Sequence, residues 1–160
     1  MPLESRDKEL AAIGTSIGAN CRPCIEHHLA AGRDAGLSPD ELADAVEVAG
    51  NVRRQAVDLL SARVTELLGG NGPLPDPIPT AETSKARELV ALGPSVGANS
   101  DVLVHTPVHA AITAGLELHQ VKSALKMAGY VQQRAAEITA EEAARAVAEC
   151  ADELTAPAAP

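Results

Sequence analysis

Two cysteines and a histidine near the start of the chain are spaced for chemistry. Cys21 and Cys24 are three residues apart, and His28 follows Cys24 by about one helical turn. Paired thiols beside an imidazole are typical either of a redox-active dithiol or of a site for a soft metal ion. These three side chains are therefore the first candidates for a functional site.

The chemistry of the pair depends on its expected place at the start of a helix. We expect this helix to open at Cys21 with Asn20 as its N-cap, so that unpaired backbone amides and the positive end of the helix dipole favour a thiolate. Residues three apart share a helix face, and their α-carbons fall within the roughly 4.4–6.8 Å that a disulfide accepts. The pair can then cycle between dithiol and disulfide.

His28 favours Cys24 over Cys21 as the reactive thiol. His28 and Cys24 occupy adjacent turns of one helix face, where the imidazole can take a proton from the thiol. Oxidation of Cys24 would give a sulfenic acid, with which Cys21 can condense to form a disulfide. The expected roles are Cys24 as the nucleophile and Cys21 as the resolving thiol.

The composition predicts an all-α protein and argues against several kinds of partner. Aromatic residues make up 1% of the 160 residues, with Tyr130 as the single example, so the core must be built from Ala, Leu, Val and Ile. Such side chains suit closely packed helices. The net charge of -9 opposes binding to nucleic acid or to an anionic membrane surface, and no apolar run approaches the ~20 residues of a membrane span.

The expected location is the cytoplasm. The first residues of the chain do not have the pattern of a signal peptide. Because structural disulfides are rare in the cytoplasm, Cys21 and Cys24 are expected to be reactive or metal-binding.

The chain repeats one unit. Residues 9–20 recur as residues 88–99, and the same offset of 79 residues relates further positions downstream. We infer a tandem duplication in which residues 1–68 form the first repeat and residues 84–154 form the second. Residues 69–83 are a Gly/Pro-rich linker, and residues 155–160 are a flexible tail.

Each repeat is predicted to contain four helices. In the first repeat they span about residues 5–17, 21–36, 39–48 and 51–69, with Ser38 and Glu41 as a capping box and Gly50 as a break. In the second repeat, Pro107 predicts either a kink or a new helix capped by Thr106. Thr139 is expected to cap the last helix.

The motif resembles that of a known family. Glu9, the Cys21-x-x-Cys24-x-x-x-His28 pattern and the following residues 35–42 are similar to the AhpD-like alkylhydroperoxidase branch of the carboxymuconolactone decarboxylase family, over about residues 5–68. The resemblance implies an all-helical fold, a homo-oligomer with a trimer favoured, and thiol-dependent reduction of a peroxide or small disulfide.

The resemblance also implies the roles of individual residues. Glu9 and His28 would relay a proton to Cys24, and Cys21 would close the disulfide. The electron donor would be a cellular dithiol or a thioredoxin-like protein, and catalysis would need no cofactor such as a flavin or nicotinamide. Decarboxylation is disfavoured because the decarboxylases of the family lack the Cys-x-x-Cys pair.

The second repeat lacks the motif. Ser100, Leu103 and Pro107 stand where the first repeat has Cys21, Cys24 and His28, which leaves one redox site per chain. Glu88 nevertheless occupies the position equivalent to Glu9, so Glu9 has a structural as well as a catalytic interpretation.

Two other functions stay open on the sequence alone. One is a soft-metal or metalloid site formed by Cys21, Cys24 and His28, with Glu9 or His27 as a further ligand. The other is a helical oligomeric scaffold whose thiol site is vestigial, in which the two cysteines simply pack between helices.

Several other polar residues are expected to have ordinary roles. His27 is a substitute or assistant for His28 but is expected to be solvated, and Cys150 is expected in the core. The remaining residues considered, none of which completes a motif, are His105, His109, His119, Arg53 and Arg54.

Overall fold

The computed structural model describes residues 3–71 and 84–155, which form six helices and, within those ranges, no strand. The helices are α1 (Ser5–Gly18), α2 (Arg22–Asp34), α3 (Pro39–Leu67), α4 (Lys85–Gly97), α5 (Asp101–Thr113) and α6 (Leu118–Thr155). The all-α fold predicted from the composition is confirmed. Most of the predicted linker and tail, residues 72–83 and 156–160, lies outside the described residues.

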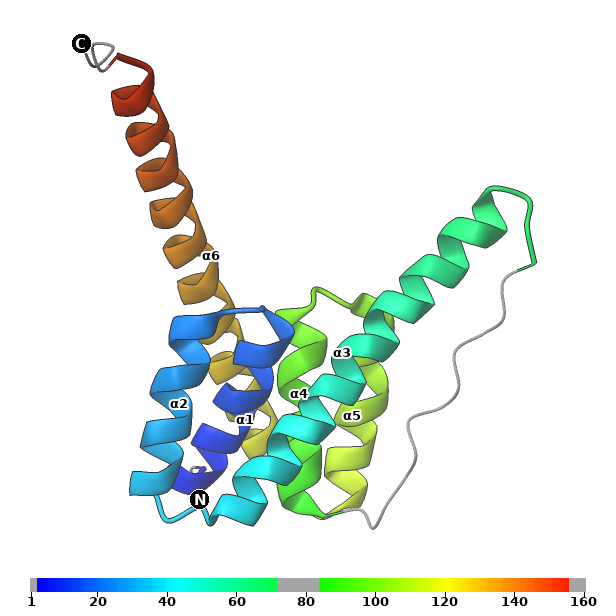
Figure 1. Cartoon of the computed structure of the whole chain (residues 1–160). Helices are drawn as coiled ribbons and strands as arrows, with labels where there is room; N and C mark the ends of the chain where they lie inside the picture. The colour runs from blue at the N-terminus through cyan, green and yellow to red at the C-terminus, as the bar shows by residue number, and fades with distance from the viewer. Residues whose placement is uncertain (1–2, 72–83, 156–160) are drawn as a thin grey trace.

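Helices α1 and α4 form the centre of the molecule. They pack against each other more extensively than any other pair, with α2 beside α1 and α5 beside α4 (Figure 1). The largest side chains that they bury completely are Ile13 on α1 and Leu89 and Leu92 on α4. Small aliphatic side chains thus fill the core, as the lack of aromatic residues requires.

Glycines allow α1 and α4 to come this close. A β-carbon added to Gly14 would lie 2.3 Å from the carbonyl oxygen of Val90, and one added to Gly93 would lie 2.4 Å from the amide nitrogen of Thr15. Real β-carbons do not approach backbone atoms so closely. Only glycine fits at these two positions, so the sequence of each central helix is adapted to the other.

The turn before Cys21 differs from the prediction. Asn20 does not cap α2; it ends α1 in a left-handed conformation with a φ of 55°. The amide of Asn20 bonds the carbonyl of Ile17, and the amide of Cys21 bonds that of Ser16, which is the hydrogen-bond pattern of a Schellman C-cap. Cys21 itself is the N-cap of α2.

Helix α3 is longer than expected. The capping box of Ser38 and Glu41 is confirmed at its start, but the predicted break at Gly50 is wrong, because α3 continues unbroken to Leu67. A glycine inside a helix costs only about 1 kcal/mol relative to alanine, and the surrounding residues are strong helix formers. The glycines that do end helices, Gly36 and Gly69, have positive φ.

The second half of the chain shows two similar corrections. Helix α5 runs through Pro107, so no new helix starts at Thr106; one proline removes one helical hydrogen bond, and those on either side are kept. Helix α6 runs through Thr139, which does not cap a helix. Instead its hydroxyl donates to the carbonyl of Ala135, 2.9 Å away, within the same helix.

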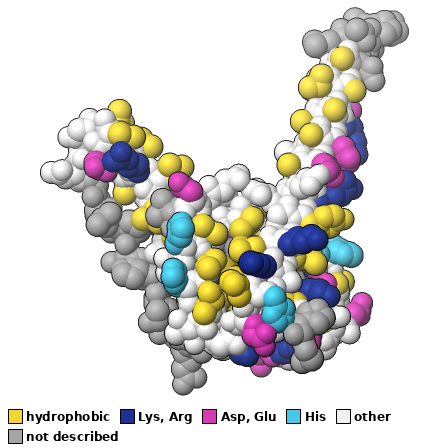
Figure 2. Space-filling model, turned by 180° about the vertical axis from the view of Figure 1, so that it is seen from behind, with side chains coloured by type: hydrophobic (Ala, Val, Ile, Leu, Met, Phe, Trp, Pro, Cys, Tyr) yellow, Lys and Arg dark blue, Asp and Glu magenta, His cyan; other side chains and the backbone are white. Residues whose placement is uncertain are grey.

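The later parts of α3 and α6 project from the body as two diverging arms (Figure 1). Figure 2 shows hydrophobic side chains along both arms. The side chains of Leu60, Leu67 and Leu68 on the first arm and Val147 on the second are 66%, 68%, 82% and 71% exposed. The apolar periodicity of these segments therefore does not serve the core of the single chain.

The sequence offset of 79 residues also relates structural features. Asn20 and Asn99 both end a helix with a φ near 55°, and Cys21 and Ser100 both cap the next helix with their side chains. These likenesses favour the duplication, which stays a prediction.

Candidate active site

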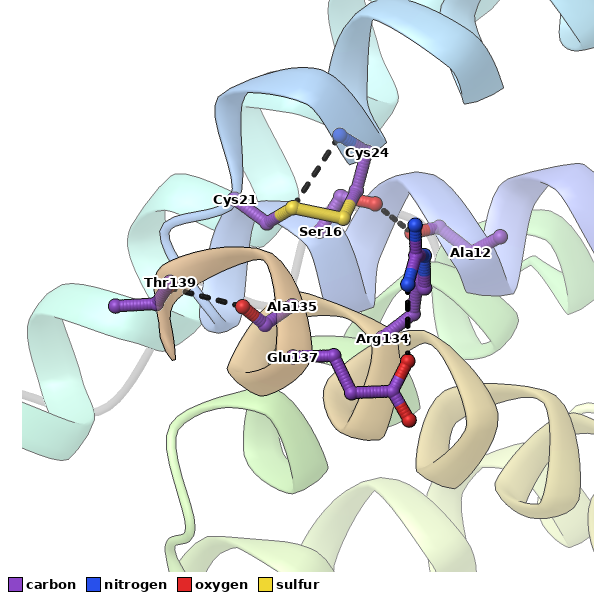
Figure 3. Close-up of a disulfide and its surroundings, with 8 residues drawn as sticks. All are labelled: Ala12, Ser16, Cys21, Cys24, Arg134, Ala135, Glu137 and Thr139. Atoms are coloured by element: carbon purple, nitrogen blue, oxygen red, sulfur yellow. Dashed lines mark hydrogen bonds and ion pairs between the residues drawn. A yellow bond between two sulfur atoms is a disulfide. The ribbon is translucent and has the colours of Figure 1, made fainter. Parts of the chain in front are cut away.

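Cys21 and Cys24 form a disulfide at the start of α2. Their α-carbons are 5.3 Å apart, inside the expected range, and each residue is 7% exposed. The sulfur of Cys21 accepts a hydrogen bond from the amide of Cys24 at 3.3 Å, which makes Cys21 the N-cap of the helix (Figure 3). Both sulfurs therefore lie at the positive end of the α2 dipole, where a thiolate is favoured.

The inner side of the disulfide packs on two other helices. The cysteines share a buried cluster with Ala12 of α1 and with Val131 and Ala135 of α6. The pair is thus buried between helices over most of its surface. Helix α6, from the far end of the sequence, forms the wall opposite α2.

Glu9 and His28 meet across α1 and α2. The Nδ1 atom of His28 lies 2.8 Å from Oε2 of Glu9, and the two side chains are 14% and 20% exposed. An imidazole held through Nδ1 keeps Nε2 as the nitrogen for proton exchange. The structure thus brings together the two residues that the resemblance paired, on the helix face that carries Cys24.

A hollow of about 260 Å³ opens beside the disulfide. Cys24 lines it, together with His27 and His28 from α2; Cys21 is not among the lining residues. Helix α6 supplies the other wall, with the side chains of Tyr130, Val131, Arg134 and Ile138. A molecule in the hollow therefore meets Cys24 first.

The side chain of Arg134 rises from α6 toward the end of α2 that carries Cys24 (Figure 3). Its Nη1 atom forms ion pairs with Glu137 at 3.0 Å and Glu141 at 3.9 Å. A guanidinium is always protonated in proteins, so Arg134 brings a positive charge to the edge of the hollow. Hydrogen bonding to Glu137 raises its pKa further.

Among known protein families, one model matches the segment that carries the two cysteines. The model of the carboxymuconolactone decarboxylase family matches residues 2–67. No curated protein and no solved structure matches the chain.

The matched family segment holds all four residues that were predicted to act together, namely Cys21, Cys24, His28 and Glu9. The α6 wall lies outside this segment. Sequence analysis missed Arg134 and Tyr130 because they are about 100 residues from the cysteines and form no motif with them. The one available signal was a basic residue on a predicted helix, which is common.

The positions equivalent to the family motif in α5 hold no thiol. Ser100 caps α5 with its hydroxyl and accepts from the amide of Leu103 at 3.3 Å, as Cys21 accepts from Cys24 in α2. Leu103 is buried, and Pro107 has no ring nitrogen able to exchange a proton. Burial raises the pKa of Glu88, which has no histidine at the position that pairs with Glu9 in the family segment.

The other residues singled out from the sequence lie away from the disulfide or serve the fold. His105 and His109 are exposed on α5, and Cys150 is exposed on the α6 arm, so its expected place in the core was wrong. His119 pairs with Glu117 at 3.1 Å.

The two neighbouring arginines bond to asparagines. Arg53 donates to Oδ1 of Asn20 at 2.9 Å and so supports the turn before Cys21, whereas Arg54 bonds to Asn51 one turn away on its own helix. Arg53 is therefore tied to the site through the turn and is more than part of a solvated face.

The described residues do not form the metal site that was left open as an alternative. Within residues 3–71 and 84–155, no group of three or more His, Cys, Asp or Glu side chains is placed to hold a metal ion. The sulfurs of Cys21 and Cys24 bond to each other, and Glu9 takes one nitrogen of His28. In the same described part of the chain, no helix has the length and apolarity to cross a membrane.

A larger open hollow of about 620 Å³ lies between α1, α3 and α4. Its charged side chains are paired, Arg6 with Glu41 and Arg87 with Asp44 at 2.6 Å. No cysteine or histidine lines it. Of these two hollows, the smaller one is lined by a cysteine and by histidines.

Proposed function

We propose that the chain is an AhpD-like, thiol-dependent oxidoreductase that reduces a peroxide or a small disulfide. The observation that carries the proposal is that a thiol and a base line the same hollow. Cys24 and His28, both from α2, line it, and Glu9 holds His28. The match to the carboxymuconolactone decarboxylase family supports the same activity.

In the proposed first step, Cys24 attacks the distal oxygen of a hydroperoxide. His28 takes the thiol proton through Nε2, the O–O bond breaks, and the proton passes to the leaving oxygen, so that the products are an alcohol and the sulfenic acid of Cys24. Glu9 stabilises the imidazolium that forms in between. The α2 dipole stabilises the attacking thiolate.

In the second step, the thiol of Cys21 displaces water from the sulfenic acid, which forms the Cys21–Cys24 disulfide. The cysteines have the spacing of that product already, since their α-carbons are 5.3 Å apart. A cellular dithiol or thioredoxin-like protein then returns the two electrons by thiol–disulfide exchange. This cycle needs no flavin or nicotinamide.

We propose that the protein is a homo-oligomer in the cytoplasm, with a trimer favoured. The exposed apolar side chains along the α3 and α6 arms support self-assembly, because isolated arms would leave Leu60, Leu67 and Val147 in water.

The test is the intact mass of the reduced protein after one equivalent of hydroperoxide. The parent should lose two hydrogens, Cys21→Ser should trap a sulfenic acid that dimedone labels, and Cys24→Ser should react little. Cys150→Ser is the matched control, because this exposed thiol is outside the site and its removal should leave the mass change intact. Equal behaviour of Cys21→Ser and Cys24→Ser would overturn the roles.

The same samples separate the activity from a vestigial scaffold. Cys24 of the reduced parent should be alkylated by iodoacetamide near pH 7 at least several-fold faster than Cys150, because the α2 dipole favours its thiolate. A rate no faster than that of Cys150, together with no loss of two hydrogens, would favour the scaffold.

A further inference from the structure

The hollow beside Cys24 has room for a molecule larger than hydrogen peroxide. Its volume of about 260 Å³ corresponds to several water molecules at roughly 30 Å³ each. It is also a little smaller than the roughly 300–1,000 Å³ of sites for drug-sized molecules. A space of this size fits a short organic chain beside the reacting group.

The lining of the hollow has an apolar part and a basic part. Pro23, Val131 and Ile138 offer apolar surface, while Arg134 supplies a positive charge; no described lining residue carries a carboxylate. Such a mixture suits a molecule with an apolar body and one anionic group.

Arg134 has the donors to bind an anion without losing its present partners. Both of its ion pairs within the described residues use Nη1, to Glu137 and Glu141. A guanidinium has five N–H donors in a planar fork, so Nε and Nη2 offer further N–H groups to a carboxylate. The side chain of Arg134 is 49% exposed, which leaves it accessible from the hollow.

The position of Arg134 is basic only in the second half of the chain. At an offset of 79 residues, Arg134 corresponds to Gln55 of α3, and Tyr130 corresponds to Asn51. A cation on the α6 wall of the hollow also offsets the repulsion of anions by a chain with a net charge of -9.

We propose that Arg134 selects oxidants that carry a carboxylate on a short apolar chain. This inference rests on the proposed function. Cys24 bonds to the distal oxygen of a hydroperoxide or to one sulfur of a disulfide, and the O–O or S–S bond breaks with release of an alcohol or a thiol. Cys21 then displaces water or the second thiol, which forms the Cys21–Cys24 disulfide. Arg134 binds the carboxylate, the apolar lining holds the chain, and the reacting atoms reach Cys24.

The test compares a short-chain hydroperoxy acid with its methyl ester, and 3,3′-dithiodipropionate with its dimethyl ester, as oxidants of the reduced oligomeric protein. The parent should use at least one acid with a kcat/KM about 5- to 10-fold above that of its ester. Whichever pair shows this preference identifies the oxidant as hydroperoxide or disulfide. Arg134→Gln should lower kcat/KM for the acid about 5- to 10-fold more than for the ester and so remove the preference, and Arg134→Lys should keep part of it.

Arg145→Gln is the matched control, because Arg145 is an exposed arginine further along α6 with an ion pair to Glu142 at 3.0 Å. It should keep the full preference. Equal kcat/KM for acid and ester in the parent, or an equal loss for both in Arg134→Gln, would overturn the inference and leave the proposed oxidoreductase intact.

A binding measurement separates the two proposals. The hydroxy acid that would be left by the hydroperoxide should slow alkylation of reduced Cys24 by neutral iodoacetamide in the parent, and the effect should disappear in Arg134→Gln. Protection without turnover of any oxidant would support the carboxylate site and contradict the oxidoreductase. Turnover with neither protection nor acid preference would support the oxidoreductase and contradict the carboxylate site.

Discussion

Nδ1 of His28 lies 2.8 Å from Oε2 of Glu9, so a carboxylate on α1 fixes the imidazole that stands one helical turn beyond Cys24. Glu9→Gln keeps the shape of the side chain but removes its charge. We expect alkylation and oxidation of Cys24 to slow roughly tenfold or more, because the imidazolium loses its stabilising partner. Stopped-flow oxidation followed across pH 5–9 measures this change and the shift in its pH profile.

Glu88→Gln is the control for that substitution, since Glu88 is the equivalent residue on α4 and its half has no cysteine or histidine at the motif positions. It should leave the rate and pH profile of Cys24 unchanged. A similar slowing in both variants would mean that the glutamates act on the fold.

The close packing of α1 against α4 leads to a second prediction. Gly93→Ala should lower the free energy of unfolding by about 1–3 kcal/mol or more, because the new β-carbon would lie 2.4 Å from the amide nitrogen of Thr15. Gly129→Ala is the matched control in α6, where an added β-carbon meets nothing within 4 Å, and it should stabilise the helix by up to about 1 kcal/mol. Urea unfolding followed by circular dichroism compares the two.

Burial raises the pKa of Glu88 above its ordinary value of 4.5. The folded state then holds this proton more tightly than the unfolded state, so stability falls as the pH rises from about 4.5 through the raised pKa. The Tm of the parent should therefore drop in this window relative to Glu88→Gln, and the variant should be the more stable of the two at pH 7.

Glu41 should change the stability of the fold with pH in the opposite direction. Its hydrogen bonds, first of all from the amide of Ser38, lower the pKa of Glu41, so its contribution to stability is lost as the pH falls. Relative to Glu41→Gln, the parent should lose Tm on acidification. The same direction of change for Glu41 and Glu88 would contradict the assigned causes.

The exposed arms predict an assembly that depends on their apolar side chains. Light scattering of the parent should give a multiple of the chain mass of 16.4 kDa, with three chains favoured. Leu60→Glu together with Leu67→Glu should shift the protein toward the single chain without loss of helix, since both residues are exposed in the isolated chain. Arg63→Glu is the control, because it changes a polar residue between them on the same arm. A parent that runs as one chain at micromolar concentration would exclude the assembly.

The reactive end of the site was predictable because its residues are close in sequence. Three residues of one helix, Cys21, Cys24 and His28, are placed by helical geometry alone, and the partner Glu9 came from the family resemblance. The capping box of Ser38 is equally local. Interactions within a few turns of one helix follow from spacing.

Features that depend on packing between distant segments were not predictable in the same way. Gly50 looked like a helix break because glycine has a low helix propensity, yet neighbouring residues carried α3 through it. Asn20 suits either end of a helix, and only the hydrogen bonds of the turn assign it to α1. The place of Arg134 beside Cys24 depends on how α6 crosses α2, which no local pattern records.

The α6 wall of the hollow belongs to the half of the chain that lacks the Cys-x-x-Cys pair. A substitution in α6 therefore changes which molecule reaches Cys24 while the groups that react with it, on α1 and α2, stay as they are. In an oligomer of identical single repeats, every substitution in the wall helix would appear in every copy of the repeat. Under the predicted duplication, selectivity can diverge in the second repeat while the reactive groups of the first repeat stay the same.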